Sequence, residues 1–230
     1  LVFLVPVIRK VWTRPIDLHP GIWMAGAAKS SLWFAAATVM GATDTVMLGT
    51  LSTPSETGLY GVAARFFMLM ALPLSAASVL MSQRAAKFYA ANDIVALEDI
   101  VRKAALRTFL SSILLAILST LAAFNVVFLF GVGFEGAFLP ILILVWSRAA
   151  VSVFGEPASA LANTAFMGTV SIVVILFAMV NFGMNALLIP EFGANGAATA
   201  TAISFLLMGL LFAYLVKKRL GIRPYPKFFS

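Results

Sequence analysis

Long runs of apolar residues recur along almost the whole chain, and they restrict its fold more than any other feature. About 20 apolar residues cross the hydrocarbon of a bilayer as an α-helix, whose backbone satisfies its own hydrogen bonds in lipid. Charged residues make up only 11% of the chain, against roughly a quarter in soluble domains. The sequence therefore predicts an all-α integral membrane protein. We expect six spans, at residues 22–51, 58–84, 104–131, 137–163, 168–189 and 195–217.

Basic residues are confined to alternate connections between these apolar runs. All but three of the 16 lysines and arginines fall within residues 9–14, 84–107 and 217–227. The other connections carry Glu56, Glu135 and Glu191. Loops that stay in the cytoplasm are rich in lysine and arginine. We therefore expect a multi-pass protein of the inner (plasma) membrane, with both ends of this segment in the cytoplasm.

The chain divides into three parts on the same grounds. The apolar run at residues 1–8 is too short to span and ends at Arg9, so we expect residues 1–21 to hold the end of a preceding helix and a cytoplasmic linker. Residues 22–217 form the six-helix bundle, and residues 218–230 a cytoplasmic tail. Within the bundle, residues 92–107 place apolar and charged side chains on opposite sides at helical spacing. This predicts either an amphipathic helix on the inner surface or a solvated connector.

Several function classes are excluded by composition. Cysteine is absent and His19 is the single histidine, which leaves no thiolate or histidine-cluster metal site. The net charge of +7 is spread over short stretches between apolar runs, and this favours a membrane surface over nucleic acid. We expect no metal and no cofactor. An enzyme acting on lipid carriers is disfavoured by the short loops, and a non-transporting scaffold is a further alternative.

Ionisable residues inside a span are costly and usually face a protein interior or a water-filled cavity. Lys29 and Asp44 share one helical face with Trp33, Ala37 and Met40 in the first span. Lys29 can alternatively extend to the inner interface, as Arg65 can to the outer one.

The fourth predicted span carries a polar stripe at helical spacing, which consists of Arg148, Ser152, Glu156, Ser159 and Asn163. Pro157 can kink the helix within this stripe. Arg148 and Glu156 either line a cavity or form an internal ion pair. Asn181 and Asn185, one turn apart in the fifth span, either bind substrate or bridge neighbouring helices.

Several short motifs, in their order, resemble a known family. They are Asp44-Thr-Val-Met-Leu-Gly49, Glu56-Thr-Gly-Leu-Tyr-Gly-Val-Ala-Ala-Arg65, and the segment that begins Asn181-Phe-Gly-Met-Asn185 and runs to Thr201. They resemble the polysaccharide-transport branch of the multidrug/oligosaccharidyl-lipid/polysaccharide exporters, which includes O-antigen flippases. The resemblance implies the second half of a twelve-helix alternating-access transporter, whose partner is an N-terminal six-helix bundle of the same protein.

The implied activity is flipping or export of lipid-linked oligosaccharide or polysaccharide precursors for cell-surface glycans. Besides the membrane lipids, this makes a lipid-linked glycan and the glycan polymerase machinery expected partners. Arginine can hold a pyrophosphate through paired hydrogen bonds. The candidate substrate-binding residues are Arg148, Arg65, Lys29, Ser152, Asn163, Asn181 and Asn185. Asp44 and Glu156 are candidates for coupling to protons or sodium. The alternative is a multidrug/cation antiporter of the same superfamily.

Overall fold

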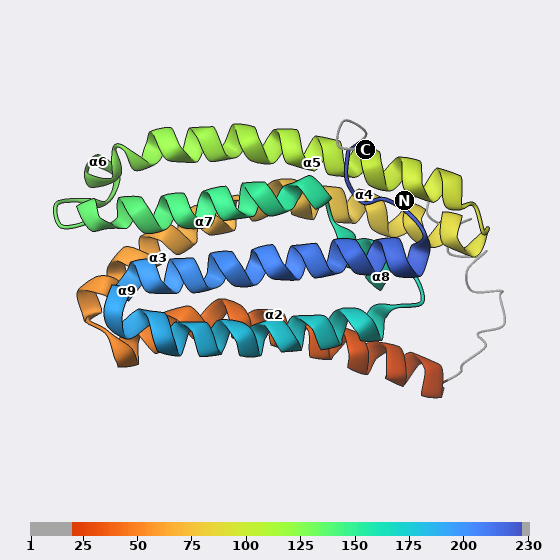
Figure 1. The fold of residues 1–230 in the computed structure, drawn as a ribbon, viewed down its shortest axis with the longest axis horizontal. Coiled ribbons are helices and arrows are strands. Elements are labelled where there is room, and N and C mark those ends of the chain that lie inside the picture. The colour runs from red at the N-terminus through yellow and green to blue at the C-terminus, as the bar shows by residue number, and fades with distance from the viewer. Residues whose placement is uncertain (1–19, 227–230) are drawn as a thin grey trace, which may run out of the picture.

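The computed structural model describes residues 20–226, which form a bundle of long helices running side by side (Figure 1). The α-helices are α2 Pro20–Leu51, α3 Pro54–Leu69, α4 Ala71–Ala90, α5 Ile94–Ala123, α6 Val126–Phe130, α7 Phe138–Val151, α8 Pro157–Ala162 and α9 Met167–Leu220. Two short 3-10 helices, η1 Glu135–Ala137 and η2 Ser152–Phe154, flank α7.

The described helices cross the bundle six times, as the sequence predicts. Five segments are long and apolar enough to span a membrane, namely Gly26–Leu51, Pro54–Ala90, Ile94–Ala123, Glu135–Phe154 and Met167–Leu220. The last of these is a hairpin, because Gly193 interrupts α9 with φ 52° and ψ −128°. The two arms of α9 then lie side by side, from cyan to blue in Figure 1. A multi-pass membrane protein is thus confirmed.

The fourth span differs from the continuous helix predicted over residues 137–163. α7 ends at Val151, and the chain passes through η2 and Gly155, with φ 64°, before α8 begins at Pro157. Gly155 lies against α5, where a Cβ would come within 2.8 Å of the Cα of Ala105. The kink attributed to Pro157 is therefore a full break, and the predicted polar stripe does not run along one helix face.

The segment at residues 92–107, predicted either as an amphipathic helix on the inner surface or as a solvated connector, is continuous in the structure with the helix of the third span. Asp93 caps a single helix, α5, by accepting a hydrogen bond of 3.0 Å from the backbone N–H of Ala96. Leu97, Val101 and Ala105 are buried along the same face of α5 as Ser112 and Ala116. No turn therefore separates the amphipathic segment from the third span, and both belong to α5.

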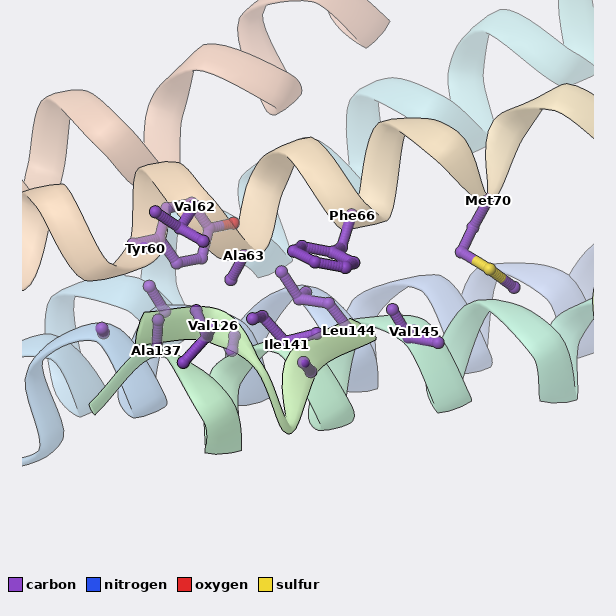
Figure 2. Packing of buried hydrophobic residues seen from close by; sticks show 14 of the residues in the cluster. Tyr60, Val62, Ala63, Phe66, Met70, Val126, Ala137, Ile141, Leu144 and Val145 are labelled. Atoms are coloured by element: carbon purple, nitrogen blue, oxygen red, sulfur yellow. The ribbon is translucent and has the colours of Figure 1, made fainter. Parts of the chain in front are cut away.

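Two buried apolar clusters hold the bundle together. In the first, Ala63 and Phe66 of α3 point toward Ile141 and Leu144 of α7 (Figure 2). The second cluster lies toward the opposite end of the bundle and includes Met81, Leu97, Leu161, Phe212 and Val216. Small residues with no exposed area allow close helix approach. They include Ala63, Ala137, Ala149, Ala197 and Ala198.

The turn between α4 and α5, the start of α2 and the end of α9 lie at one end of the bundle (Figure 1). The basic residues at positions 84–107 and 217–219 belong to these segments. The gathering of both basic clusters at one end agrees with an even number of crossings. Which side of the membrane this end faces stays a prediction, as do the proposed boundaries at 21 and 217. The predictions for residues 1–19, including His19, and for 227–230 lie outside the described residues.

Candidate functional site

A cavity of about 400 Å³ lies between α2, α3, the break that separates α7 from α8, and the second arm of α9. Trp33, Ala37, Met40 and Asp44 line it from α2, which confirms the predicted common face for these four residues. Most of the remaining wall is apolar and includes Phe67, Leu74, Val151, Phe205, Met208 and Phe212. The charged groups in the wall are Asp44, Arg148 and Glu156.

Asp44 is buried at this wall, with 3% of its surface exposed. Its Oδ2 accepts hydrogen bonds from the hydroxyl of Tyr60 on α3 and, at 2.6 Å, from Thr201 Oγ1 on α9. Its Oδ1 accepts a hydrogen bond of 2.6 Å from Asn185 Nδ2. Three donors on two other helices therefore fix one carboxylate, and these bonds join α2 to α3 and to both arms of α9.

A second layer of amides lies behind Asp44. Asn181 Nδ2 donates to Thr201 Oγ1 at 3.2 Å, and Asn181 Oδ1 accepts from Asn185 Nδ2 at 3.2 Å. Both asparagines have no exposed surface and neither lines the cavity. Their placement corresponds to the helix-bridging alternative, while direct substrate binding by Asn181 and Asn185 stays a prediction.

Arg148 lies between two aromatic rings in the cavity wall. Its guanidinium carbon is 5.5 Å from the ring centroid of Phe67 and 5.1 Å from that of Phe205. A cation stacked on aromatic faces is stabilised by the ring quadrupoles. Among the described residues no carboxylate lies within 4.0 Å of it, and its Nε is buried without a hydrogen-bond partner. Of the two predicted alternatives for Arg148 and Glu156, the structure has both residues lining the cavity, without a direct ion pair between them.

Glu156 occupies the position just before α8 and lines the same cavity. Its Oε2 accepts a hydrogen bond of 3.1 Å from Ser159 Oγ, which lies 2.7 Å from Ser78 Oγ on α4. The break at Gly155 brings Glu156 to this position. A carboxylate at a chain break, linked to α4 through two hydroxyls, can respond to a movement of either element.

The other predicted site residues lie elsewhere. Arg65 is exposed, 5.8 Å from the Phe130 ring, and does not line the cavity. Ser152 is buried and donates to the Ala149 carbonyl at 2.6 Å, while Asn163 donates to the Ser159 carbonyl at 2.8 Å. Both therefore use their polar groups on local backbone. Substrate binding by these three stays a prediction, and nothing is described for the Lys29 side chain.

Sequence reasoning missed four residues of the site. Tyr60 and Thr201 bind Asp44, and Phe67 and Phe205 hold Arg148. Tyr60 and Thr201 belong to motifs that carried the family resemblance, and each places a hydroxyl in an apolar helix. A hydroxyl side chain in one apolar span can serve as a hydrogen-bond donor to an acidic residue in another span, and this signal could have identified Tyr60 and Thr201.

The chain has the fold of one half of a twelve-helix transporter. An outward-facing multidrug resistance MATE family transporter of the MOP superfamily matches it with a TM-score of 0.70 at 18% identity, over 86% of this chain and 46% of that one. The structure of a MATE in the bent conformation matches with a TM-score of 0.68 at 19% identity, over 84% of this chain and 44% of that one. A MOP superfamily transporter from Pyrococcus furiosus matches with a TM-score of 0.63 at 16% identity, over 88% of this chain and 46% of that one.

In sequence, residues 30–137 match the MatE family, and no curated protein matches the chain. The chain spans about half the length of the similar transporters. These matches confirm the predicted all-α membrane fold, and the chain shares it with about half of each of these transporters. The finer assignment to the polysaccharide-transport branch, with its O-antigen flippases, finds no support in these matches, and neither does the choice of the second bundle.

Proposed function

We propose that this chain forms one half of an alternating-access transporter that exports amphipathic organic compounds, chiefly organic cations, in exchange for protons or sodium ions. One observation carries the proposal: the buried carboxylate of Asp44 lies at the cavity wall and is held by donors from α3 and from both arms of α9. This carboxylate is the coupling group.

The coupling follows from the number of bonds that Asp44 accepts. An ionised carboxylate can accept all three hydrogen bonds. A protonated carboxyl group accepts fewer hydrogen bonds, and its own O–H needs an acceptor. Neutralising Asp44 by a proton, or drawing it to a sodium ion, therefore weakens the attachment of α2 to α3 and α9. A ligand shifts a conformational equilibrium only through such a differential interaction. Binding of the coupling cation and binding of the substrate thus favour different positions of α2, and each disfavours the other.

The choice of substrate class rests on the cavity wall. Aromatic and aliphatic side chains cover most of it, and two carboxylates, Asp44 and Glu156, face one arginine. Apolar walls with a few polar groups suit drug-sized ligands, and the excess of acid favours cations. One similar structure is reported as a multidrug resistance transporter, which is consistent with this class.

A lipid-linked glycan is the second candidate, and Arg148 is the observation that favours it. Arg148 places a guanidinium in the cavity wall, and a guanidinium can hold a pyrophosphate through paired hydrogen bonds. The Pyrococcus furiosus transporter is reported to have a binding pocket of reversed polarity that suggests a different function. The sign of charge in the cavity is accordingly the property that separates the two candidates.

Transport by the reconstituted protein, with both six-helix bundles present, tests the proposal. Proteoliposomes are loaded with ethidium or with a fluorescent lipid-linked oligosaccharide, and a proton or sodium gradient is imposed. We expect gradient-driven movement of ethidium and no gradient-driven flipping of the lipid-linked sugar. Flipping of the sugar without movement of ethidium would transfer the assignment to the second candidate, and movement of neither would refute both.

A further inference from the structure

A second hollow lies outside the cavity just described, at the basic end of the bundle. It has a volume of about 890 Å³ and runs between α4 and α5, the two helices joined by the turn at residues 91–93. Its walls come from successive turns of both helices, namely Pro73, Ala76, Ala77, Met81, Arg84, Lys87 and Phe88 on α4, and Ala96, Asp99, Ile100, Lys103, Ala104, Arg107, Thr108 and Ser111 on α5. We call it the α4–α5 groove.

The two ends of the α4–α5 groove differ in chemistry. Toward the turn, four basic side chains face one acid, Asp99, whose Oδ2 is 2.7 Å from Lys103 Nζ. The four basic side chains are exposed and are those of Arg84, Lys87, Lys103 and Arg107. Farthest from the turn, Pro73, Ala76 and Ala77 form an apolar wall on α4, opposite Thr108 and Ser111 on α5. The groove is thus an apolar channel with a strongly cationic mouth.

A buried polar atom marks the boundary between the two ends. Thr108 lines the groove one residue beyond Arg107, has 1% of its surface exposed, and its Oγ1 has no hydrogen-bond partner. A buried hydroxyl without a partner costs free energy. A ligand that places an oxygen atom at this depth can satisfy the hydroxyl, and the ester oxygens of a phospholipid lie between its phosphate and its acyl chains.

The depth of the cations agrees with a headgroup position. α5 has 30 residues and is about 45 Å long at 1.5 Å per residue, about 15 Å more than the hydrocarbon thickness. Residues 108–134 carry no charged side chain, so the excess length lies at the end that begins with Ile94. Lys103 is then level with the edge of the hydrocarbon, and Arg107 extends to it from just inside.

We propose that the α4–α5 groove binds one anionic phospholipid of the surrounding leaflet. Arg84, Lys103 and Arg107 hold its phosphate, and Lys87 attracts the headgroup from the side of the turn. One acyl chain lies along Pro73, Ala76 and Ala77. Basic pockets between helices at the membrane surface hold anionic headgroups in this way. The site is separate from the transport cavity and does not depend on the proposed substrate.

The test uses the purified protein in nanodiscs of phosphatidylcholine with a minor share of phosphatidylglycerol and no polyprenyl lipid. Native mass spectrometry reports which lipid stays bound. We expect retention of one phosphatidylglycerol in preference to phosphatidylcholine. Replacing Arg84, Lys103 and Arg107 together by glutamine should lower its affinity by about tenfold or more, because each cation near the surface contributes about a fivefold effect.

A matched control has the same charge change at the same end of the bundle. Lys217, Lys218 and Arg219 are exposed, lie at the end of α9 and do not line the groove. Their joint replacement by glutamine should leave phosphatidylglycerol retention unchanged. An equal loss in this control would mean general attraction to the basic surface and would overturn the proposal.

A second pair of variants tests the shape of the groove with all charges kept. Ala76 is exposed and lines the groove, so Ala76→Trp places an indole in it. Ala86 is exposed on the same helix but does not line the groove, so Ala86→Trp places the indole outside it. Only the first should abolish retention. Retention that survives Ala76→Trp, or that is absent in the unmodified protein because another segment covers the groove, would overturn the assignment.

Discussion

The side chain of Glu56, in the first turn of α3, accepts a hydrogen bond of 2.7 Å from the backbone N–H of Ala194. Ala194 follows Gly193, at which α9 turns back on itself. The carboxylate therefore satisfies one of the N–H groups that begin the second arm of α9, where the helix dipole favours negative charge. This contact ties α3 to the α9 hairpin at the end of the bundle opposite the basic residues.

Glu56→Ala should lower the free energy of unfolding by about 2 kcal/mol, because a hydrogen bond to a charged group is removed and the N–H of Ala194 loses its partner. Thermal unfolding of the protein in detergent measures this change. Glu135→Ala, an exposed acid at the same end, is the control and should change little. Equal effects of the two substitutions would show that the contact contributes nothing.

Gly193→Ala should destabilise the hairpin of α9. The backbone at Gly193 has φ 52° and ψ −128°, which side chains disfavour, and a Cβ would lie 2.4 Å from the Glu56 carboxylate. We expect a loss of at least about 1 kcal/mol. Gly183→Ala lies in the same helix with no atom within 4 Å of its Cβ, and this control should be neutral or stabilising. A neutral Gly193→Ala would contradict the described turn.

Thr201→Val should lower cation-driven transport by roughly tenfold. The substitution keeps the shape of the side chain but removes the hydrogen bond to Asp44, and bonds to charged groups contribute about 1.5–3 kcal/mol. Thr199→Val is the matched control, since Thr199 donates only to the Asn195 carbonyl. Initial rates in proteoliposomes measure both. A rate that falls equally in the two variants would indicate a general effect of threonine loss in α9.

Arg148→Gln should make the cavity more selective for organic cations. Among the residues that the structure describes, Arg148 is the cation of the cavity wall, and the variant removes it while Asp44 and Glu156 stay in place. Uptake of cations should therefore rise severalfold, and binding of anionic compounds should fall. Arg65→Gln changes the same charge at an exposed position outside the cavity and should do neither. If the two variants behaved alike, Arg148 would have no special role in selectivity.

Much of the fold could be predicted from the sequence because hydrophobic length and charge placement act through the bilayer, which is the same for every membrane protein. The six crossings and the shared face of Trp33, Ala37, Met40 and Asp44 follow from these two properties and from helical spacing. The break at Gly155 could not be predicted in this way. Pro157 is a local signal for a kink, but the full break depends on the close approach of Gly155 to Ala105, which lies 50 residues earlier in the chain.

The candidate site was only partly predictable for a similar reason. Spacing along one helix placed Asp44 on the right face, but its partners come from α3 and α9. A polar residue in a span signals that a partner exists without indicating which one. The sequence therefore selected Asn181 and Asn185 without separating a bridging role from a binding role, and it gave Arg65 the same weight as Arg148.

The proton or sodium dependence of transport in Asp44→Asn tests the central claim most directly. Asparagine keeps the size of the side chain but cannot exchange a charge, and Asp93→Asn, at the cap of α5, is the matched control. In proteoliposomes with an imposed cation gradient, we expect Asp44→Asn to bind ethidium but to lose its gradient-driven movement, and Asp93→Asn to keep both. Gradient-driven transport at the normal rate by Asp44→Asn would contradict the account.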